Sequence, residues 1–316
     1  MSYKKQATAM SSIIYKGTRG PMFKALISGL MERGNLKDKY IGILTNDENM
    51  KKFSKAFTAA SANKNENYEI YEQIGDVSAN KFIVWYAYQR FPQLNCPAGV
   101  KVVARLRINY GAKNSFAQIA DDLGFWPYIS AAEDGTDRSA KYRSRHKKDL
   151  LEDVFEAFVG CTEQILDQEY RPGVGYGVIY DILSSIFNKI PISLKFEDLI
   201  DAKTRMKEIF DAFGDTIGSY QFIDTREEKT SPDGELYRIA LSYLYQVPPG
   251  GNRRAIKINT PTGQQSRPNK GWNLIGQGSG TTKSSAQQKA SEQGIITLNS
   301  RGYIKEVPIE YRLFCK

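Results

Sequence analysis

Apolar residues follow helical patterns through the first half of the chain. KFIVWYAYQRF (residues 81–91) is strongly apolar, SFAQIADDLGF (115–125) carries apolar residues at helical spacing, and DLLEDVFEAFVGCTEQIL (149–166) is amphipathic throughout. The segments between them, such as FPQLNCPAG and SAAEDGTDRS, have the Pro, Gly, Asp and Ser content of loops. The pattern predicts an all-α domain over residues 21–188, after a flexible basic arm at residues 1–20.

The pattern changes after residue 188. A proline-containing stretch predicts a linker at residues 189–200, and DAKTRMKEIFDAFG predicts a helix that Gly214 ends. SYQFIDTREE, ELYRIALSYLYQV and GWNLIGQG alternate as strands do, and KSSAQQKASEQGIITL predicts a closing helix. We therefore expect an α+β (α-β-β-β-α) domain over residues 201–299, with an insertion near 247–270 and a tail at 300–316.

Charge is distributed unevenly along the 316 residues, whose length suits two domains. The net charge of +9 favours a polyanionic partner, either nucleic acid or an anionic membrane surface. No Asp or Glu occurs between Leu236 and Ser291, a window that holds eight Lys or Arg residues. A solvated basic surface would explain such a run, but its length favours a binding face.

Cysteine, histidine and hydropathy exclude several classes of protein. The three cysteines are scattered, which indicates neither a disulfide framework nor a CxxC metal site and favours a reducing compartment such as the cytoplasm. No apolar run of about 18 residues and no secretory signal occurs, so we expect no membrane segment. The single histidine, His146, lies within KYRSRHKK and is interpreted as a surface residue. Any catalysis must therefore depend on carboxylates.

Two helical segments carry acidic residues on one face. In YEIYEQIGD, Glu69, Glu72 and Asp76 stand at i, i+3 and i+7. In EDVFEAFVG, Asp153 and Glu156 stand at i and i+3. Like charges on one stripe repel, and the repulsion grows if they are desolvated, so a cation between the helices is expected. An all-oxygen donor set suits Mg²⁺ or Mn²⁺ and is poor for zinc.

Two glycines bear on the alternative, which is that both helices merely expose an acidic face to solvent. Gly75 directly precedes Asp76, and Gly160 lies one turn after Glu156. Glycine destabilises a helix, so its presence at both places favours a close approach of two backbones. We therefore favour the metal site.

The residues described so far resemble the ribonuclease III family. YEIYEQIGD is similar to the family signature Glu-x-x-Glu-Phe-Leu-Gly-Asp, and EDVFEAFVG to its second motif, Asp-x-x-Glu-Ala-x-x-Gly. GQGSGTTKSSAQQKASEQG resembles the last strand-to-helix junction of a double-stranded RNA-binding domain, with Gly278, Gly280, Thr282 and Lys283 at the matching positions. The resemblance covers roughly residues 39–298.

This resemblance implies a homodimeric, Mg²⁺-dependent endoribonuclease, with Mn²⁺ able to substitute. Such an enzyme cuts both strands of duplex RNA and leaves 5′-phosphates and 3′-hydroxyls with short 3′ overhangs. The catalytic, metal-binding carboxylates match Glu72, Asp76, Asp153 and Glu156, and Glu69 matches a supporting residue. A two-metal mechanism then follows, in which one ion activates a water and the other stabilises the departing 3′-oxygen.

The resemblance also implies a set of RNA contacts, because A-form duplexes are read through phosphates and 2′-hydroxyls. The matching positions lie on the first helix of the second domain, in the loop TSPDG and at the start of the last helix. Basic residues of the insertion could add phosphate contacts, although a disordered loop is the alternative. The resulting candidates are Arg205, Glu208, Pro232, Lys283, Arg253, Arg254 and Lys257.

The chain departs from the family pattern without losing a carboxylate. Gln73 and Ile74 replace Phe-Leu of the signature, while Ser284 and Gln287 stand where lysines are common. The arm, the insertion and the tail fit a divergent member, such as one from a large DNA virus. The alternatives are a catalytically inactive relative that binds or sequesters duplex RNA, a helical metal-binding domain acting on nucleotides, and a DNA-binding protein. The retained carboxylates favour the nuclease, and no helix-turn-helix or zinc pattern supports DNA binding.

Overall fold

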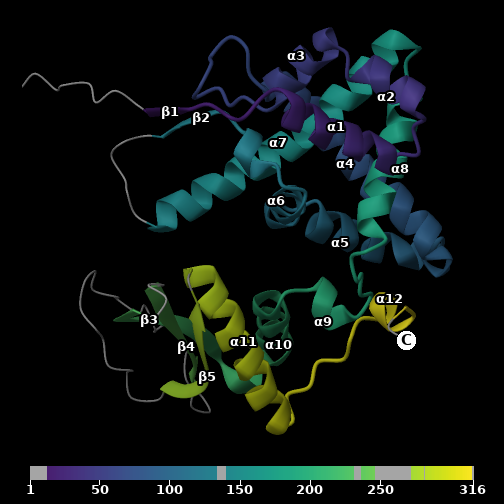
Figure 1. Ribbon diagram of the computed structural model, residues 1–316. Helices are drawn as coiled ribbons and strands as arrows, with labels where there is room; N and C mark the ends of the chain where they lie inside the picture. The colour runs from purple at the N-terminus through teal and green to yellow at the C-terminus, as the bar shows by residue number, and fades with distance from the viewer. Residues whose placement is uncertain (1–12, 134–139, 231–235, 246–271, 281, 315–316) are drawn as a thin grey trace, which may run out of the picture. The chain divides into compact units, whose positions relative to one another are not determined.

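The chain forms two compact units, Met1–Ile192 and Ser193–Lys316, in a computed structural model (Figure 1). The structure describes residues 13–133, 140–230, 236–245, 272–280 and 282–314. Each unit is presented by itself.

The first unit is predominantly helical, as the sequence pattern predicts. Besides short 3-10 turns, its elements are β1 (Ile13–Tyr15), α1 (Pro21–Arg33), α2 (Asp38–Leu44), α3 (Asp47–Ala56), α4 (Glu69–Arg90), α5 (Val100–Tyr110), α6 (Lys113–Asp122), β2 (Ala131–Glu133), α7 (Ala140–Glu169) and α8 (Val174–Phe187). Local chemistry accounts for several boundaries. Pro21 occupies the first turn of α1, and the side chain of Asn46 caps α3 by accepting from Asn49 N at 2.8 Å. Gly124, with φ 78°, turns the chain after α6.

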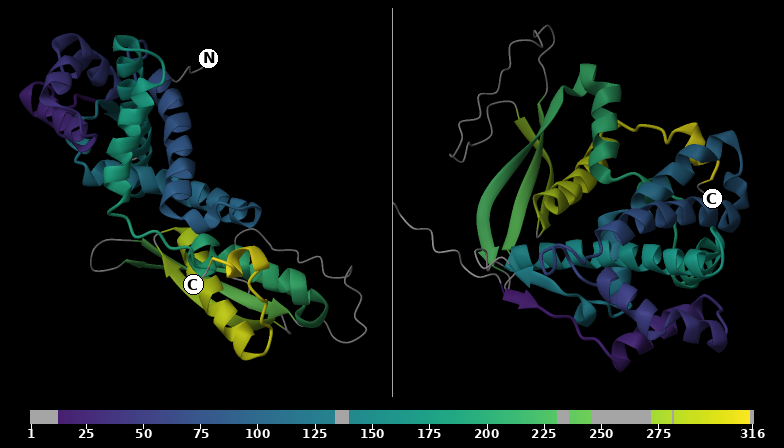
Figure 2. Two further views of the ribbon diagram at one scale, coloured as in Figure 1. Left: turned by 90° about the vertical axis from the view of Figure 1, so that its right-hand side faces the viewer. Right: turned by 90° about the horizontal axis from the view of Figure 1, so that it is seen from above.

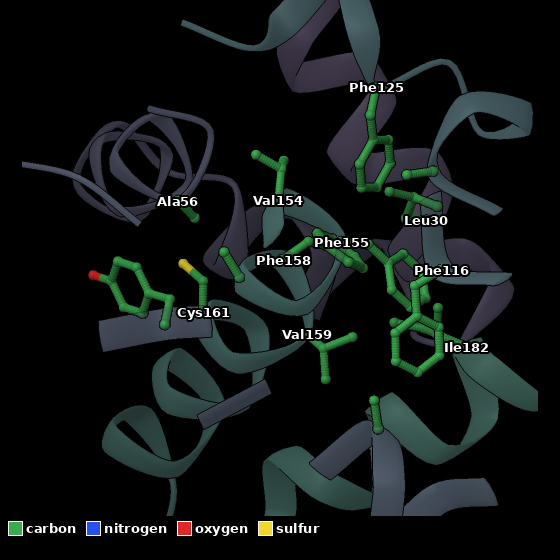
Figure 3. Close-up of a cluster of buried hydrophobic side chains, with 14 of the residues drawn as sticks. Leu30, Ala56, Phe116, Phe125, Val154, Phe155, Phe158, Val159, Cys161 and Ile182 are labelled. Carbon is green, nitrogen blue, oxygen red and sulfur yellow. The ribbon is translucent and has the colours of Figure 1, made fainter. Parts of the chain in front are cut away.

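The core of the first unit is built around α7, which packs against α3, α4, α6 and α8. Phe155 and Phe158 of α7 are fully buried among other aromatic rings (Figure 3). The Phe155 ring lies 5.1 Å from that of Phe116 on α6, and the Phe158 ring lies 5.7 Å from that of Phe125. Burial of large aromatic side chains on this face fixes the rotation of α7 about its own axis. Another face of α7 carries the acidic residues Asp149, Glu152, Asp153 and Glu156.

Helices α4 and α7 meet backbone to backbone at Gly75 and Gly160. A Cβ atom on Gly75 would lie 1.8 Å from Glu156 O, and one on Gly160 would lie 2.0 Å from Tyr71 O. Neither distance is physically possible, so only glycine permits this approach. The prediction of close backbone contact at both glycines is confirmed, and it brings the two acidic stripes to the same place.

The end of the predicted N-terminal arm is built into the fold. Residues Ile13–Tyr15 form β1, which pairs with β2 in antiparallel register. Arg19 donates from Nη1 to Tyr128 O at 2.5 Å and from Nε to Ser54 Oγ at 2.5 Å. The prediction of a flexible arm is therefore wrong for residues 13–20, because these hydrogen bonds join segments far apart in sequence. Residues 1–12 lie outside the described part.

The second unit contains an antiparallel sheet whose strands follow one long helix along the chain and precede another. Its elements are α9 (Phe196–Leu199), α10 (Ala202–Ile217), β3 (Ser219–Thr230), β4 (Leu236–Tyr245), β5 (Trp272–Gly280), α11 (Lys283–Ser300) and α12 (Ile309–Arg312). The sheet has the order β3-β4-β5, and α10 and α11 lie side by side on one face of it (Figure 2). Met206, Ile275 and Leu298 are buried between these helices and the sheet.

Helix α10 continues past Gly214, where the sequence predicts its end. The helix extends to Ile217, which is fully buried, and stops at Gly218 with φ 79°. Burying an isoleucine outweighs the roughly 1 kcal/mol that glycine costs inside a helix. The stop therefore falls at the glycine whose positive φ other residues avoid.

The predicted linker and tail are both structured and contact each other. Helix α9 lies within the linker range 189–200, and α12 lies within the tail range 300–316. The rings of Phe196 and Tyr311 are 5.1 Å apart, and Tyr303 lies 5.8 Å from Phe213 on α10. Aromatic packing between these segments depends on the fold, so a proline and the lack of a helical stripe in the sequence could not reveal it.

Candidate active site

The first half of the site comes from the N-terminal two turns of α4. Glu69 is exposed at the first position of the helix, Glu72 is partly buried one turn later, and Asp76 is exposed one turn beyond. Asn80 donates from Nδ2 to Asp76 Oδ1 at 2.7 Å, which orients that carboxylate. All three acidic side chains follow one stripe of the helix, as the spacing predicts.

The second half comes from the middle of α7. Asp153 is partly buried and accepts a hydrogen bond from the Tyr68 hydroxyl at 2.6 Å, Oδ2 being the acceptor. Glu156 is only 7% exposed. Its carboxylate makes no hydrogen bond or ion pair with another residue in the described ranges. A largely buried carboxylate surrounded by other negative charges is costly and needs an explanation.

The carboxylates of the two helices lie close enough to perturb each other. Burial, followed by the charge of Asp76 and those of other acids, raises the pKa of Glu156 to about 8. Burial, followed by the charge of Asp153, raises the pKa of Glu72 to about 7. Each helix thus acts on an acid of the other, so the structure brings Glu72, Asp76, Asp153 and Glu156 into one electrostatic group.

A lysine and two further acids adjoin this group. Lys113 Nζ, at the start of α6, lies 2.5 Å from Glu152 Oε2 and 3.1 Å from Asp149 Oδ1 on α7. Burial lowers the pKa of Lys113, but its ion pairs with the two carboxylates outweigh that effect and raise it. Sequence reasoning missed this trio. Asp149 and Glu152 share the stripe of Asp153 by spacing, whereas Lys113 is distant in sequence and gives no local signal.

His146 is closer to the acidic group than its basic surroundings suggest. It is partly buried on α7, and its charge contributes to lowering the pKa of Asp153, although burial raises that pKa overall. The prediction of a plain surface residue is therefore only partly correct, since the helix carries it two turns from Asp153.

The donor set suits a hard divalent cation. Within the described ranges, no group of three or more His, Cys, Asp or Glu side chains is arranged to hold a metal ion as it stands. The residues nevertheless fit such an ion, because Glu156 is largely buried among other carboxylates, and burial followed by the charges of those carboxylates raises its pKa. Carboxylate oxygens are the ligands that Mg²⁺ and Mn²⁺ prefer.

The RNA-contact candidates of the second unit differ in their exposure and in their contacts within the unit. Lys283 is exposed at the N-terminus of α11, but Arg205 Nε donates to Ile200 O at 3.0 Å. Glu208 forms an ion pair with Lys305 of the tail at 2.8 Å. Both α10 candidates are thus engaged within their own unit. The remaining candidates lie outside the described residues, namely Pro232, Arg253, Arg254 and Lys257.

A lysine of α10 reaches the start of α11. Lys203 Nζ donates to Gln287 Oε1 at 2.9 Å, and it lies 5.6 Å from the centre of the Phe222 ring. This contact places an ammonium group beside Gln287 from another helix, which no local pattern in the sequence could indicate.

Comparison with known proteins identifies the first unit. The Ribonuclease III domain family matches residues 69–163, from the start of α4 into α7. A protein of Invertebrate iridescent virus 6 that bears the name ribonuclease 3 is 37% identical over 316 residues, which cover 96% of each chain. The chain belongs to the ribonuclease III family. The family predicted from the two acidic motifs is thereby confirmed.

Other members of the ribonuclease III family align over shorter stretches. A Frog virus 3 protein of the same name is 41% identical over 197 residues, 62% of this chain and 51% of its own. Ribonuclease 3 of Limosilactobacillus reuteri is 27% identical over 254 residues, 78% of this chain and 89% of its own. The solved nuclease domain of ribonuclease III from Campylobacter jejuni, 23% identical, covers 52% of this chain and 99% of its own with a TM-score of 0.37.

Membership makes the chain a ribonuclease of a family whose members generally depend on divalent metals. Both of its carboxylate motifs fall inside the matched range. In the described part of the chain, no helix has the length and apolar character required to cross a membrane.

Replacing Glu156 with Gln should stabilise the metal-free protein at alkaline pH. The folded-state pKa values of Glu72 (about 7) and Glu156 (about 8) exceed the ordinary value of 4.5. The stability that these groups contribute is fully present below about pH 4.5 and is lost as the pH rises through 7 and 8. At pH 8 in EDTA, the E156Q variant should therefore melt a few degrees higher than wild type. This corresponds to a free energy of unfolding that is greater by roughly 1–2 kcal/mol.

Thermal unfolding at pH 6 and pH 8 measures this effect. Glu169→Gln, an exposed change at the end of α7, is the matched control and should follow wild type. Equal losses of stability between the two pH values in wild type and E156Q would contradict the assignment of repulsion to Glu156.

Proposed function

We propose that the protein is a Mg²⁺-dependent endoribonuclease specific for duplex RNA. The observation that carries this proposal is the convergence of acidic side chains from α4 and α7 beside the Gly75–Gly160 contact. Buried like charges of this kind are expected where a cation binds. Family membership supports the same activity, and retention of all four carboxylates opposes an inactive RNA-binding relative.

Glu72, Asp76, Asp153 and Glu156 would hold the metal ions. Bound divalent ions supply activation of a water nucleophile and neutralisation of charge on the leaving 3′-oxygen, in the manner of two-metal nucleases. Asn80 holds Asp76 through its 2.7 Å hydrogen bond. Tyr68, the residue directly before α4, holds Asp153 of α7 by donating from its hydroxyl to Asp153 Oδ2 at 2.6 Å. These bonds fix the carboxylates before the substrate arrives, which limits reorganisation during the reaction.

The expected products follow from the position of bond cleavage. Attack of water on phosphorus with departure of the 3′-oxygen leaves a 5′-phosphate and a 3′-hydroxyl on each cut strand. Cleavage of both strands by two symmetry-related sites would produce short 3′ overhangs. Glu69, exposed at the start of α4, is proposed as a supporting residue rather than a ligand.

The second unit is proposed as a double-stranded RNA-binding domain. Its α10–sheet–α11 arrangement and the exposed Lys283 at the N-terminus of α11 support this role. The positive end of a helix favours phosphate, and Lys203 adds a second ammonium near the first turn. Together these groups suit the phosphates on either side of a groove in A-form RNA.

The exposed face of α4 supports a homodimer. Ile70, Val77 and Val84 are 57%, 67% and 39% exposed and stand seven residues apart, so they follow one stripe of the helix. An exposed apolar stripe on a long helix is a typical protein interface. We propose that two copies of the chain associate through this stripe, which would place two cleavage sites on one duplex.

The E156Q variant should lose Mg²⁺-dependent cleavage by at least about a hundredfold while still binding duplex RNA, because only the metal-binding group changes. The measurement is the rate of cutting of a labelled long RNA duplex in Mg²⁺ and in EDTA, with direct detection of 5′-phosphate ends. Glu169→Gln is again the control and should cut as wild type does. Unchanged turnover in E156Q would refute the assignment, and binding without any wild-type cleavage would favour the inactive relative.

Replacing Lys283 with Ala should weaken duplex binding several-fold. The slope of log affinity against log salt should become shallower by about 0.9, since one phosphate contact is lost. Filter binding at several salt concentrations measures both quantities. Arg301→Ala, at the opposite end of α11, serves as the control. A salt slope in Lys283→Ala equal to that of wild type would exclude a phosphate contact.

Sedimentation equilibrium should give wild type twice the chain mass of 35.7 kDa. Val77→Asp should shift it to the monomer, because a buried unpaired charge opposes association. Val100→Asp is a matched control, since Val100 is 65% exposed on another helix of the same unit. A monomeric wild type, or a dimer that Val77→Asp leaves intact, would contradict the proposed interface.

A further inference from the structure

The acidic stripe of α7 holds more carboxylates than the proposed metal site uses. Asp149, Glu152, Asp153 and Glu156 stand at i, i+3, i+4 and i+7, so all four share one face of the helix. Only Asp153 and Glu156 belong to the proposed metal-binding set. Asp149 and Glu152 would otherwise add two negative charges to a group that already repels itself.

Lys113 pairs with both surplus acids. Its Nζ lies 2.5 Å from Glu152 Oε2 and 3.1 Å from Asp149 Oδ1, which forms a three-membered ion cluster between α6 and α7. The side chain of Glu152 is only 16% exposed and that of Lys113 is 48% exposed, so the pair is shielded from water on the Glu152 side alone. The charge of Lys113 also opposes the upward shifts in the pKa of Glu72 and Asp153. Lys113 is thus electrostatically coupled to both helices of the site.

Releasing Glu152 from its ion pair with Lys113 would change the number of carboxylates available to a bound cation. Glu152 directly precedes Asp153, and rotation of an unpaired side chain would offer an additional carboxylate to an ion beside it. Mg²⁺ demands near-octahedral coordination with few protein carboxylates and several positions left for water or phosphate. An extra carboxylate would bind the ion more tightly while occupying a position that the substrate needs.

We propose that Lys113 is a positioning residue that keeps the carboxylates of Asp149 and Glu152 out of the metal-binding set and limits the negative charge of the site. This inference rests on the proposed nuclease function. It concerns the number of ligands and the charge at that site, which the function itself does not specify.

A second ion pair between the same helices separates this role from simple tethering. Lys147 of α7 lies 2.8 Å from Asp121 Oδ2 of α6. Loss of either lysine removes a link between α6 and α7, but only Lys113 pairs with the stripe that carries the proposed ligands. Lys147→Met is therefore the matched control for Lys113→Met, a change that keeps chain length and removes the charge.

Calorimetric titration of Mn²⁺ into the metal-free protein, without RNA, provides the first readout. Lys113→Met should bind Mn²⁺ about three- to tenfold more tightly than wild type, because a nearby positive charge is gone and Glu152 is free. Its rate of duplex cleavage at saturating metal should nevertheless fall by at least about tenfold. Adding Glu152→Gln to Lys113→Met should return both quantities toward wild type, while Lys147→Met should leave both unchanged.

Glu152→Gln alone tests the inference even if Lys113→Met does not fold. A residue outside the metal-binding set should leave Mn²⁺ affinity within about threefold of wild type, whereas a ligand should reduce it tenfold or more. The inference is overturned if Glu152→Gln loses affinity to that extent, or if a folded Lys113→Met matches wild type or matches Lys147→Met. If wild type itself neither binds Mn²⁺ nor cuts duplex RNA, the proposed function fails instead.

Discussion

The direct contact of two helix backbones at Gly75 and Gly160 determines the geometry of the site. A methyl group at either position would overlap a carbonyl oxygen of the opposite helix, so the separation of α4 and α7 is set by the absence of side chains. At that separation the acidic side chains on neighbouring turns of α4 and α7 lie close enough to repel one another. The raised pKa of Glu156 is therefore a consequence of helix packing, and a cation is the natural means of relieving it.

The aromatic core supports this contact from the other side of α7. Phe155 and Phe158 are fully buried and lock the helix so that Asp153 and Glu156 face α4. The repulsion between the acids reduces the stability of the metal-free protein, while burial of the aromatic side chains offsets that cost. Functional sites commonly retain such local destabilisation because the same groups are needed for binding or chemistry.

Sequence alone predicted the part of the site that is encoded locally. The spacing of acids along each helix and the paired glycines indicated both stripes and their approach. The sequence could not reveal Lys113, Tyr68 as a partner of Asp153, or Lys203 beside Gln287, because these contacts join distant segments. Three-dimensional packing also explains why α10 passes Gly214.

The tail shows the same limit for RNA contacts. Lys305 pairs with Glu208, and Arg205 binds a carbonyl oxygen of its own unit, so a motif position does not by itself identify a free contact residue. A family motif shows which residues of this chain stand at the motif's positions. The intramolecular contacts of each side chain depend on other segments, which the motif does not include. Lys283 is exposed at the first position of α11.

The most direct test of the central claim is a crystal structure of the protein grown in Mn²⁺, with anomalous diffraction to locate the metal. The account predicts anomalous density between α4 and α7, within coordination distance of Glu72 or Asp76 on one helix and Asp153 or Glu156 on the other. Carboxylates turned away from one another, with no anomalous density between the two helices, would contradict it.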